Sequence, residues 1–599
     1  MIILVDQFRQ PLWLNSTQAA YLQETVVPNI IQKIRNKSYV FQQYFACANR
    51  CTPARATLLT GLYAPQTHMY AGEDSVSTPS LQTAFPTWGW AIQQPNLFGN
   101  NPSPYANNVW WFGKWHLSDA YPGATKPLLG YGFNTELYPG TNAPSPNGYP
   151  NEGVNGGLYQ GHTYASDSEI AGDFTSWLGG ATGPWCATVS LINPHDIALA
   201  PNWLNPALSF PLPGWTPPWF PPTNPDNPLP VFTYPMLPYP DPWNYEKPTY
   251  GCWGASHHKP TLQWEYYNSV NTSFGYANDN VTDITLFLNN YYWLQYFVDQ
   301  QVGSVLNALS NSPYANHTIV VFTSDHGEYA LSHGLHDKGS AVYDEGIRVP
   351  LYVQFPGQSY YVDMEQMCSS VDFFGLVFDL ATIAPGNTGS WRAPYPSLGN
   401  RESIYNYLSS NSAENYRLVS SAWGNVGNLA GQPYIMHTFD ETTPSEDPNS
   451  QYNGQDTCSA VKAHIVCLRT KSQNTCGQTS GFTGGKIAFY STWAQCSTAP
   501  DGTAGDYEWE FYDYQYGGSS GVGNIAELDN DYYVAPTNFG NFQAALGVSF
   551  TGGACALVDE LNAPLQGNGT DGNPLTDAQC TAQQAYFTYR GWTGCGSCP

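Results

Sequence analysis

Charged residues are scarce in this chain, and basic residues are the scarcest of them. Only 11% of the 599 residues are Asp, Glu, Lys or Arg, and 20 Lys and Arg stand against 46 Asp and Glu. The formal net charge of −26 argues against a nucleic-acid partner, because phosphate binding needs a basic face. An anionic substrate would have to be drawn in by a local cluster of cations, against the field of the whole molecule.

Long apolar runs are also missing. No run of about 18 apolar residues is present, so we expect no transmembrane helix. The apolar start, Met1 to Val5, is too short for a signal peptide and is followed at once by Asp6. We therefore expect Ile2–Val5 to be the first core strand. Either an export signal lies outside this chain, or the disulfides inferred from the cysteines below are not formed.

The chain is long and rich in ring and turn residues. With 15% aromatic residues, 48 Pro and 56 Gly, its composition is that of a folded, loop-rich protein. A chain of 599 residues is expected to form more than one domain.

Cysteine usage indicates an oxidising compartment. Eight of the 13 cysteines follow residue 450: Cys458, Cys467, Cys476, Cys496, Cys555, Cys580, Cys595 and Cys598. Only Cys595 and Cys598 have a metal-like spacing, and they lack a second pair, so we expect disulfides and no zinc site. Glycosylation acceptor triplets give weak support to a secreted, lumenal or periplasmic glycoprotein: Asn15, Asn36, Asn271, Asn280, Asn316 and Asn568.

Strand and helix patterns alternate along the first part of the chain. After Ile2–Val5, residues 291–309 predict an amphipathic helix, and residues 318–323 and 349–355 predict strands. This order predicts an α/β fold with a large doubly wound sheet, mixed or parallel, covered by helices. In such sheets the chemistry gathers at the carboxyl ends of strands, where Asp6 and Asp325 stand.

The residue composition differs between the first and the last part of the chain. We expect a catalytic α/β domain over residues 1–400, with a Pro/Trp-rich insertion at 199–260 that is either a structural loop or a wall of the substrate cleft. Residues 401–599 are rich in Gly, Ser, Thr and Cys and predict a smaller α+β domain. Strands are expected there near 464–470 and 486–491.

Residues 51–55 read Cys-Thr-Pro-Ala-Arg and run on into Leu-Leu-Thr-Gly at 58–61. This segment resembles the signature of the formylglycine-dependent sulfatases, which belong to the alkaline phosphatase superfamily. In that family a modifying enzyme oxidises the cysteine to formylglycine, whose hydrate is the nucleophile. A lone cysteine is more often simply buried or disulfide-bonded, so the rest of the chain has to decide. Without Cys51 the cysteines are even in number, which suits disulfide pairing.

Further sulfatase-like motifs follow in the family's order. Asp6-Gln7 ends the first strand, Gly-Lys-Trp-His occupies 113–116, and Asn-Pro-His-Asp occupies 193–196. Ser-Asp-His-Gly-Glu at 324–328 is followed by Lys338-Gly339 and by Glu-Gly-Ile-Arg-Val-Pro at 345–350. The resemblance is close over residues 1–385 and loose beyond them. There it implies a further strand near 508–514, because that segment resembles a strand of the family's small carboxy-terminal domain.

The resemblance assigns a role to each motif residue. It implies that Cys51 is the nucleophile, and that Arg55, on the same helix face, hydrogen-bonds its hydrate. Lys114 and His116, two apart on an extended segment, would point the same way, with Lys114 on a sulfate oxygen and His116 as proton acceptor. His195 and Lys338 would bind the sulfate, with His195 favoured as the acid for the leaving alcohol.

The resemblance also implies a metal site. Asp6, Gln7, Asp325 and His326, together with the modified Cys51, would hold one divalent cation. Ca²⁺ is expected first, because most of these ligands are oxygens, with Mn²⁺ or Mg²⁺ as alternatives. Gln7 and His326 depart from the Asp-Asp and Asp-Asn sets of many sulfatases and look more like the phosphonate monoester hydrolase and choline-sulfatase branches.

Three functions therefore stay open. The first is hydrolysis of sulfate monoesters of small molecules or carbohydrates, after maturation by a formylglycine-generating enzyme. The second is phosphonate monoester or phosphodiester hydrolysis on the same fold. The third, of another class, is an inactive secreted binding protein. The sequence does not indicate an oligomeric state.

Overall fold

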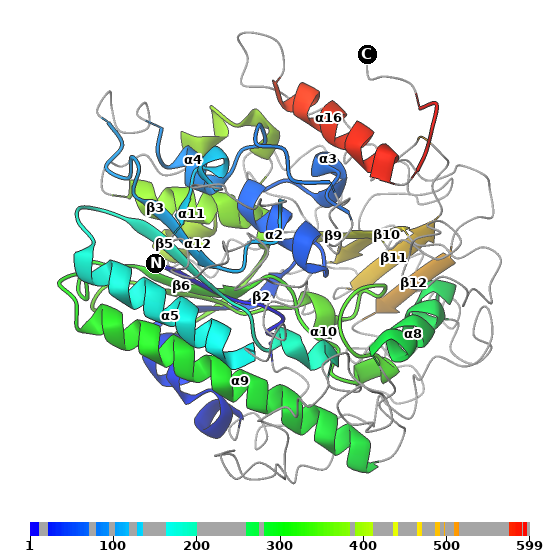
Figure 1. Ribbon diagram of the computed structural model, residues 1–599, viewed down its shortest axis with the longest axis horizontal. Helices are drawn as coiled ribbons and strands as arrows, with labels where there is room; N and C mark the ends of the chain where they lie inside the picture. The colour runs from blue at the N-terminus through cyan, green and yellow to red at the C-terminus, as the bar shows by residue number, and fades with distance from the viewer. Residues whose placement is uncertain are drawn as a thin grey trace, which may run out of the picture.

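A large sheet runs through the centre of the computed structural model (Figure 1). The structure describes residues 1–10, 22–70, 79–94, 102–118, 128–135, 163–199, 259–274, 281–383, 390–399, 401–410, 435–440, 464–469, 485–491, 496, 508–513, 574–589 and 591–595. The sheet has eight strands in the order β4-β3-β5-β1-β6-β7-β2-β8. Their bounds are β1 Ile2–Val5, β2 Tyr39–Phe45, β3 Val109–Gly113, β4 Asn134–Thr135, β5 Cys186–Leu191, β6 Val320–Ser324, β7 Leu351–Gln354 and β8 Val362–Ser369.

Most neighbouring strands of this sheet run parallel. β1 lies between β5 and β6 and is parallel to both. Only β7 runs antiparallel, to β6 on one side and β2 on the other. The predicted α/β class with a mixed sheet is confirmed, and the antiparallel strand is the one predicted at 349–355.

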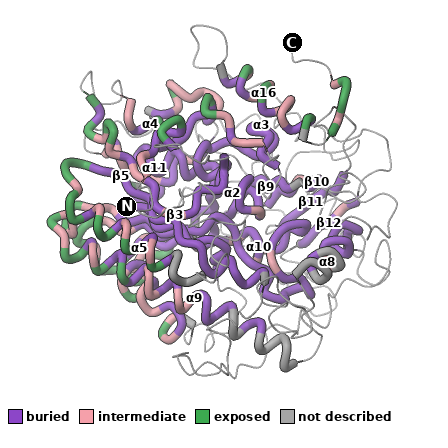
Figure 2. Tube along the Cα trace, in the orientation of Figure 1, coloured by how far each residue is buried: buried purple, intermediate pink, exposed green. Residues whose placement is uncertain are grey.

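Both faces of the sheet are buried, as the unbroken apolar run of β1 requires. Ile3 and Val5 pack on one face, against the layer of α5 (Thr163–Gly180) and α9 (Val281–Ser310). Ile2 and Leu4 pack on the other face, against a layer that includes α2 (Cys51–Thr60), α4 (Trp88–Ala91) and α11 (Phe373–Thr382). Figure 2 shows the sheet and α2 as buried, with exposed residues on the outer side of α5.

The predicted helix at 291–309 lies within α9, which begins ten residues earlier, at Val281. The predicted strand at 318–323 corresponds to β6. Shorter helices complete the described part of this layer structure: α3 Ala64–Thr67, α10 Asp344–Ile347 and α12 Ile404–Ser410, with η1 Leu22–Val26, η2 Ile30–Ile34, η3 Arg35–Lys37, η5 Leu129–Tyr131, η7 His195–Leu199, η8 Ser332–Gly334, η9 Ser370–Asp372, η10 Ser390–Arg392 and η11 Pro396–Leu398.

A second, antiparallel sheet belongs to the last part of the chain. Its strands are β9 Ile435–Asp440, β10 His464–Arg469, β11 Gly485–Ser491 and β12 Glu508–Asp513, in the order β12-β11-β10-β9. The strands predicted near 464–470, 486–491 and 508–514 are confirmed. α8 (Thr261–Phe274) packs on this sheet through Leu262 and Trp264. The domain boundary at residue 400 stays a prediction.

α16 (Pro574–Tyr589) ends the described helices and lies beside α3, where Tyr586 packs against Tyr70 (Figure 1). A disulfide joins Cys496 to Cys595. Cys580 is also disulfide-bonded. A staple in the carboxy-terminal part is therefore present, as predicted.

The even number of cysteines that remain without Cys51 suggested that these pair in disulfides, and for four of them this is wrong. Cys47, Cys186, Cys368 and Cys467 are not disulfide-bonded, and all four are buried. Cys186, Cys368 and Cys467 lie on β5, β8 and β10, and Cys47 lies just after β2. A buried thiol packs there as a small apolar side chain. An even number of cysteines therefore does not show that these four form disulfides.

No helix in the described ranges is long and apolar enough to span a membrane. Residues 200–258, which make up nearly all of the predicted Pro/Trp-rich insertion, lie outside the described residues. Whether the insertion forms a wall of the cleft stays a prediction.

Candidate active site

Two neighbouring parallel strands end at the same edge of the large sheet. Val5 of β1 pairs with Ser324 of β6, so Asp6 and Asp325 follow the two strands at the same level. Both carboxylates are fully buried. The carboxyl edge therefore brings together the acidic residues that the sequence placed at strand ends.

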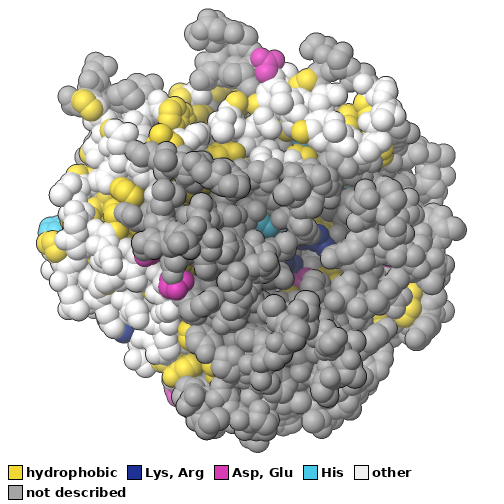
Figure 3. Space-filling view, viewed as in Figure 1, with side chains coloured by type: hydrophobic (Ala, Val, Ile, Leu, Met, Phe, Trp, Pro, Cys, Tyr) yellow, Lys and Arg dark blue, Asp and Glu magenta, His cyan; other side chains and the backbone are white. Residues whose placement is uncertain are grey.

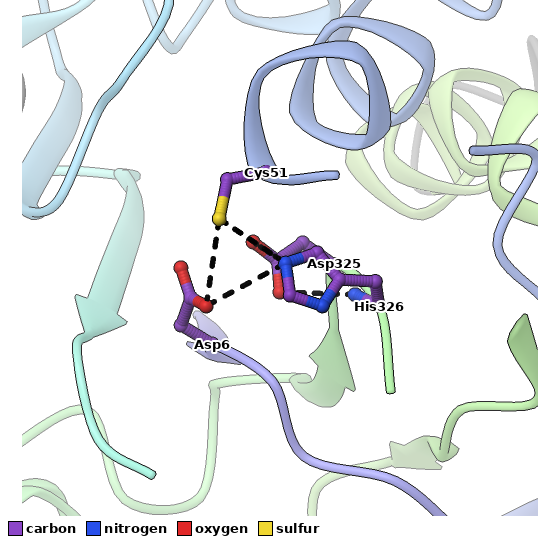
Figure 4. Close-up of side chains that lie close together, drawn as sticks. All are labelled: Asp6, Cys51, Asp325 and His326. Carbon is purple, nitrogen blue, oxygen red and sulfur yellow. Dashed lines mark hydrogen bonds and ion pairs between the residues drawn. The ribbon is translucent and has the colours of Figure 1, made fainter. Parts of the chain in front are cut away.

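Cys51 reaches this edge from the first turn of α2 (Figure 4). Arg50 before it is extended, and the helix begins at Cys51 itself. The Cys51 Sγ lies 3.2 Å from His326 Nε2 and 3.9 Å from Asp6 Oδ1. Because the amino terminus of a helix carries free N–H groups and a positive partial charge, an anionic nucleophile is favoured at this position.

Arg55 lies one helical turn after Cys51 and joins the two carboxylates. Its guanidinium donates to Asp6 Oδ2 at 2.8 Å and to Asp325 Oδ2 at 2.9 Å. It also donates to the Lys114 carbonyl at 2.8 Å and to Ser190 Oγ at 3.0 Å. The expected shared helix face is confirmed, but these contacts make Arg55 the fixed connection between β1, β5 and β6.

Lys114 follows β3 and points toward Asp6 and Cys51. Its Nζ lies 2.9 Å from Asp6 Oδ2 and 3.7 Å from the Cys51 sulfur. Gly113 before it has φ 92°, and a Cβ there would lie 2.1 Å from the Ser190 carbonyl oxygen. That oxygen accepts the Lys114 N–H at 3.0 Å, so only glycine allows β3 to approach β5 this closely.

His116 reaches Cys51 by a different path from the one expected. The segment after β3 is not extended, because His116 has φ 61°. The strand alternation that would have aligned Lys114 and His116 is therefore absent. A hydrogen bond from His116 still helps to lower the pKa of the Cys51 thiol, so both side chains meet the sulfur.

His195 begins the short helix η7 after β5 and is almost completely buried, at 5% exposure. Its Nδ1 lies 3.8 Å from Asp196 Oδ1. Burial, Lys114 and Lys338 oppose a charge on His195, but Asp196 and Cys51 outweigh them and raise its pKa. The geometry and charges around His195 therefore favour its protonated form beside the sulfur more than water would.

Lys338 lies across from Lys114 and is held by polar neighbours. Its Nζ donates to Gln7 Oε1 and lies 3.1 Å from Asp337 Oδ1. The Gln7 amide nitrogen donates to Glu328 and to Asp337, the latter at 3.2 Å. Gln7 thus lies beside the acidic pair, but its amide oxygen already accepts a hydrogen bond from Lys338.

The acidic cluster fits a divalent cation. One ligand atom from each of Asp6, Cys51, Asp325 and His326 lies within 4.8 Å of all the others, and all four residues are buried. His326 Nδ1 faces the Gly327 carbonyl at 2.9 Å, so Nδ1 carries the hydrogen and Nε2 is the nitrogen that faces the cluster. Burial opposes a charge on His326, yet Asp325 and Cys51 raise its pKa to about 9, which reflects the excess of negative charge there.

The same site strongly favours an anion at position 51. Burial alone would raise the pKa of the Cys51 thiol. Lys114, Lys338 and His326, with a hydrogen bond from His116, outweigh this and hold the pKa well below its usual value. Lys or Arg side chains and a His side chain also lie together near the middle of the face shown in Figure 3.

The sequence did not assign several residues that complete the site. Ser190 accepts from Arg55, and Glu328 and Asp337 orient Gln7 and Lys338. Each lies within a sulfatase-like motif, at the end of a strand or directly before a site residue, which was the available signal. Asp167, which contacts the segment before His195, stood in no motif.

A family model named Sulfatase matches residues 1–227 and 249–383, more than half of the chain. The chain belongs to the sulfatase family. Cys51, Lys114 and Asp325 lie in the motifs that resemble those of this family. The structure brings these three residues into one buried cluster.

Curated relatives match over short segments. The chain is 42% identical over 88 residues to the uncharacterized sulfatase YidJ of Escherichia coli, covering 14% of this chain and 17% of that protein. It is 32% identical over 121 residues to arylsulfatase K of Danio rerio, covering 20% and 22%. The matched segments thus span about a fifth of these relatives.

Solved structures resemble the chain over nearly its whole length. A putative sulfatase from Bacteroides thetaiotaomicron aligns with a TM-score of 0.56 and 19% identity, covering 96% of this chain and 97% of that one. A phosphonate monoester hydrolase from Silicibacter pomeroyi aligns with a TM-score of 0.54 and 18% identity, covering 91% and 92%. At such identities the likeness shows a shared fold.

Proposed function

We propose that this sulfatase-family protein hydrolyses sulfate monoesters with a formylglycine nucleophile made from Cys51. The observation that carries the proposal is the position of Cys51, buried at the start of α2 and surrounded by Lys114, Lys338 and His326. Cations that hold a thiolate also stabilise an oxyanion on the modified residue. The hydrate has one hydroxyl to attack sulfur and a second whose deprotonation expels sulfate.

The residues around position 51 divide the work. Lys114 and Lys338 neutralise the sulfate oxygens, which the protein as a whole repels. Arg55 fixes the two carboxylates, and so fixes the edge on which the nucleophile sits. His116 takes the proton from the hydrate when sulfate leaves.

His195 is proposed as the acid that protonates the leaving alcohol. It faces Cys51, and although burial disfavours its charge, Asp196 and the sulfur raise its pKa. A proton donated to the ester oxygen is needed most when the leaving alcohol is a poor one, such as a sugar hydroxyl.

Asp6, Asp325, His326 and the modified residue 51 would hold one divalent cation, with Gln7 as a further ligand only if its amide leaves Lys338. The bound cation would supply charge stabilisation to the sulfate oxygens. We favour Ca²⁺, because most of the ligands are oxygens, which also keeps Mg²⁺ as an alternative; the imidazole nitrogen of His326 makes Mn²⁺ a further alternative.

Phosphonate monoester or phosphodiester hydrolysis is the second candidate. The residue types at positions 7 and 326, Gln and His, resemble those of the phosphonate monoester hydrolase branch. Sulfate and phosphonate monoesters carry the same charge, so the electrostatics of the site does not separate them. The extra substituent on phosphorus needs additional room beside Lys114 and His195. We favour the sulfate ester on the prediction that the insertion at 199–260, most of which lies outside the described residues, narrows this space.

The proposal also covers the maturation, the location and the substrate of the protein. A modifying enzyme must act on Cys51 during maturation, and the disulfides support a secreted, lumenal or periplasmic location. Of the glycosylation acceptors, Asn36 and Asn316 are exposed. The substrate is proposed to be a small-molecule or carbohydrate sulfate ester.

The test compares matched aryl sulfate and aryl phosphonate monoesters on protein produced with a formylglycine-generating enzyme. The proposal expects a higher kcat/KM on the sulfate, no turnover by Cys51→Ala, and loss of turnover on chelation. Calorimetry of the chelated protein should show one Ca²⁺ or Mn²⁺ bound per chain. A higher kcat/KM on the phosphonate would establish the second candidate, and full activity without metal would refute the cation site.

A further inference from the structure

Asp167 is a buried carboxylate that lies outside every sulfatase-like motif. It is on α5, its side chain is fully buried, and it contacts the segment between β5 and His195. Oδ1 accepts the Ile192 N–H at 2.6 Å. Oδ2 accepts the Asn193 N–H at 3.1 Å and the Asn193 side-chain amide at 2.9 Å.

These bonds fix the start of the loop that carries His195. β5 ends at Leu191, so the next two N–H groups leave the sheet and need acceptors in a buried place. Asp167 supplies both. The Ile192 carbonyl in turn accepts the His195 N–H at 3.2 Å. A continuous set of hydrogen bonds thus runs from Asp167 to the backbone of His195.

A carboxylate is unfavourable at this position because it is buried. Burial raises the pKa of Asp167 to about 7, although its hydrogen bonds to Ile192 and Asn193 act in the opposite direction. The advantage of a carboxylate is geometric, because two oxygens on one rigid plane hold two successive N–H groups at once. An amide offers only one acceptor oxygen.

We propose that Asp167 is a positioning residue that holds His195 where it protonates the leaving alcohol. The inference rests on the proposed function, in which His195 is that acid. Asp167 touches no reacting atom, and it acts only through Ile192 and Asn193. Displacing a catalytic group by about 1 Å can lower a rate by about 100-fold.

The chain contains a matched control in Asp299. This fully buried carboxylate on α9 also accepts two successive backbone N–H groups, from Asn29 at 3.0 Å and Ile30 at 2.8 Å. It accepts the Asn29 side-chain amide at 2.8 Å, and burial raises its pKa to about 6. Its partners lie at the start of the helix η2 and not before a site residue. Asp167→Asn and Asp299→Asn therefore make the same chemical change in two places.

The experiment measures kcat/KM for a series of aryl sulfates that differ in the pKa of the leaving phenol. Asp167→Asn should lose less than about threefold on 4-nitrophenyl sulfate, which needs little proton donation, and about 10- to 100-fold on the phenols of highest pKa. The slope against leaving-group pKa should steepen. Asp299→Asn should keep the slope of the wild type, even if both variants melt at lower temperature.

If Asp167→Asn does not fold, Asn193→Ala removes the side-chain bond to Asp167, leaves the two backbone N–H groups that Asp167 accepts, and should steepen the slope in the same direction. An equal loss on every substrate, or a slope that matches Asp299→Asn, would make Asp167 purely structural and overturn the inference. A wild type that cleaves none of the sulfates would instead refute the proposed function, and the inference would fall with it.

Discussion

Arg55 is the residue on which the geometry of the site depends most. Four acceptors surround its guanidinium: Asp6, Asp325, the Lys114 carbonyl and Ser190. Lysine keeps the charge but presents a single nitrogen, so Arg55→Lys cannot satisfy them all. We predict a loss of about 2–4 kcal/mol in the free energy of unfolding and a fall of about 100-fold in kcat/KM on an aryl sulfate.

The control for Arg55→Lys is Arg401→Lys. Arg401 is also buried, at 4% exposure, but donates to neutral oxygens of Gly61 and Gln66. Its replacement should lower stability and leave kcat/KM within about twofold. Denaturant unfolding and steady-state kinetics on the two variants give the comparison. Equal effects on kcat/KM would mean that Arg55 has no special role at the site.

At the residue scale the sequence predicted which side chains meet but not how they meet. Cys51, Lys114, His195 and His326 converge as the motif order implied. The left-handed turn at His116 was not predictable, because no sequence rule placed φ 61° on a histidine.

Gln7 is a second example at this scale. The motif implied a metal ligand, whereas the contacts that its amide makes to Lys338 and Glu328 depend on how distant segments fold together. No pattern in the sequence measures such contacts. The role of Gln7 as a ligand stays a prediction.

At the scale of elements, the junction of β3 and β5 positions Lys114. Gly113→Ala would place a Cβ 2.1 Å from the Ser190 carbonyl oxygen, in a backbone conformation of φ 92°. We predict a loss of about 2–4 kcal/mol in the free energy of unfolding from strain and overpacking, and an aryl sulfate kcat/KM at least about tenfold lower.

Gly357→Ala is the matched control for this junction. Gly357 also has positive φ, at 74°, but a Cβ added there would meet no heavy atom within 4 Å. This variant should lose only about 1 kcal/mol, from backbone strain, and keep its kcat/KM. If the two alanine variants behave alike, close strand contact at Gly113 does not control the site.

The elements themselves were partly predictable. An unbroken apolar run predicted β1, and amphipathic spacing predicted most of α9. The antiparallel direction of β7 was not predictable, because strand direction depends on how the chain returns and not on the pattern within the strand. Asp167 was not predictable for a related reason, because it acts through contacts with a strand end that is distant in sequence.

At the scale of the whole molecule, the number of cysteines did not predict which of them form disulfides. We predict that differential alkylation of denatured protein labels Cys47, Cys186, Cys368 and Cys467 without prior reduction. Cys496 and Cys595 should be labelled only after reduction. Peptide mass mapping checks this, and a disulfide at any of the four buried thiols would contradict it.

The formylglycine content at residue 51 tests the central claim most directly. Preparations made with increasing amounts of the modifying enzyme should differ in the fraction of Cys51 converted, measured by peptide mass spectrometry. We predict that aryl sulfate turnover rises in proportion to that fraction and extrapolates to zero where Cys51 is unmodified. Full turnover by protein that retains the Cys51 thiol, or none by fully converted, metal-loaded protein, would contradict the account.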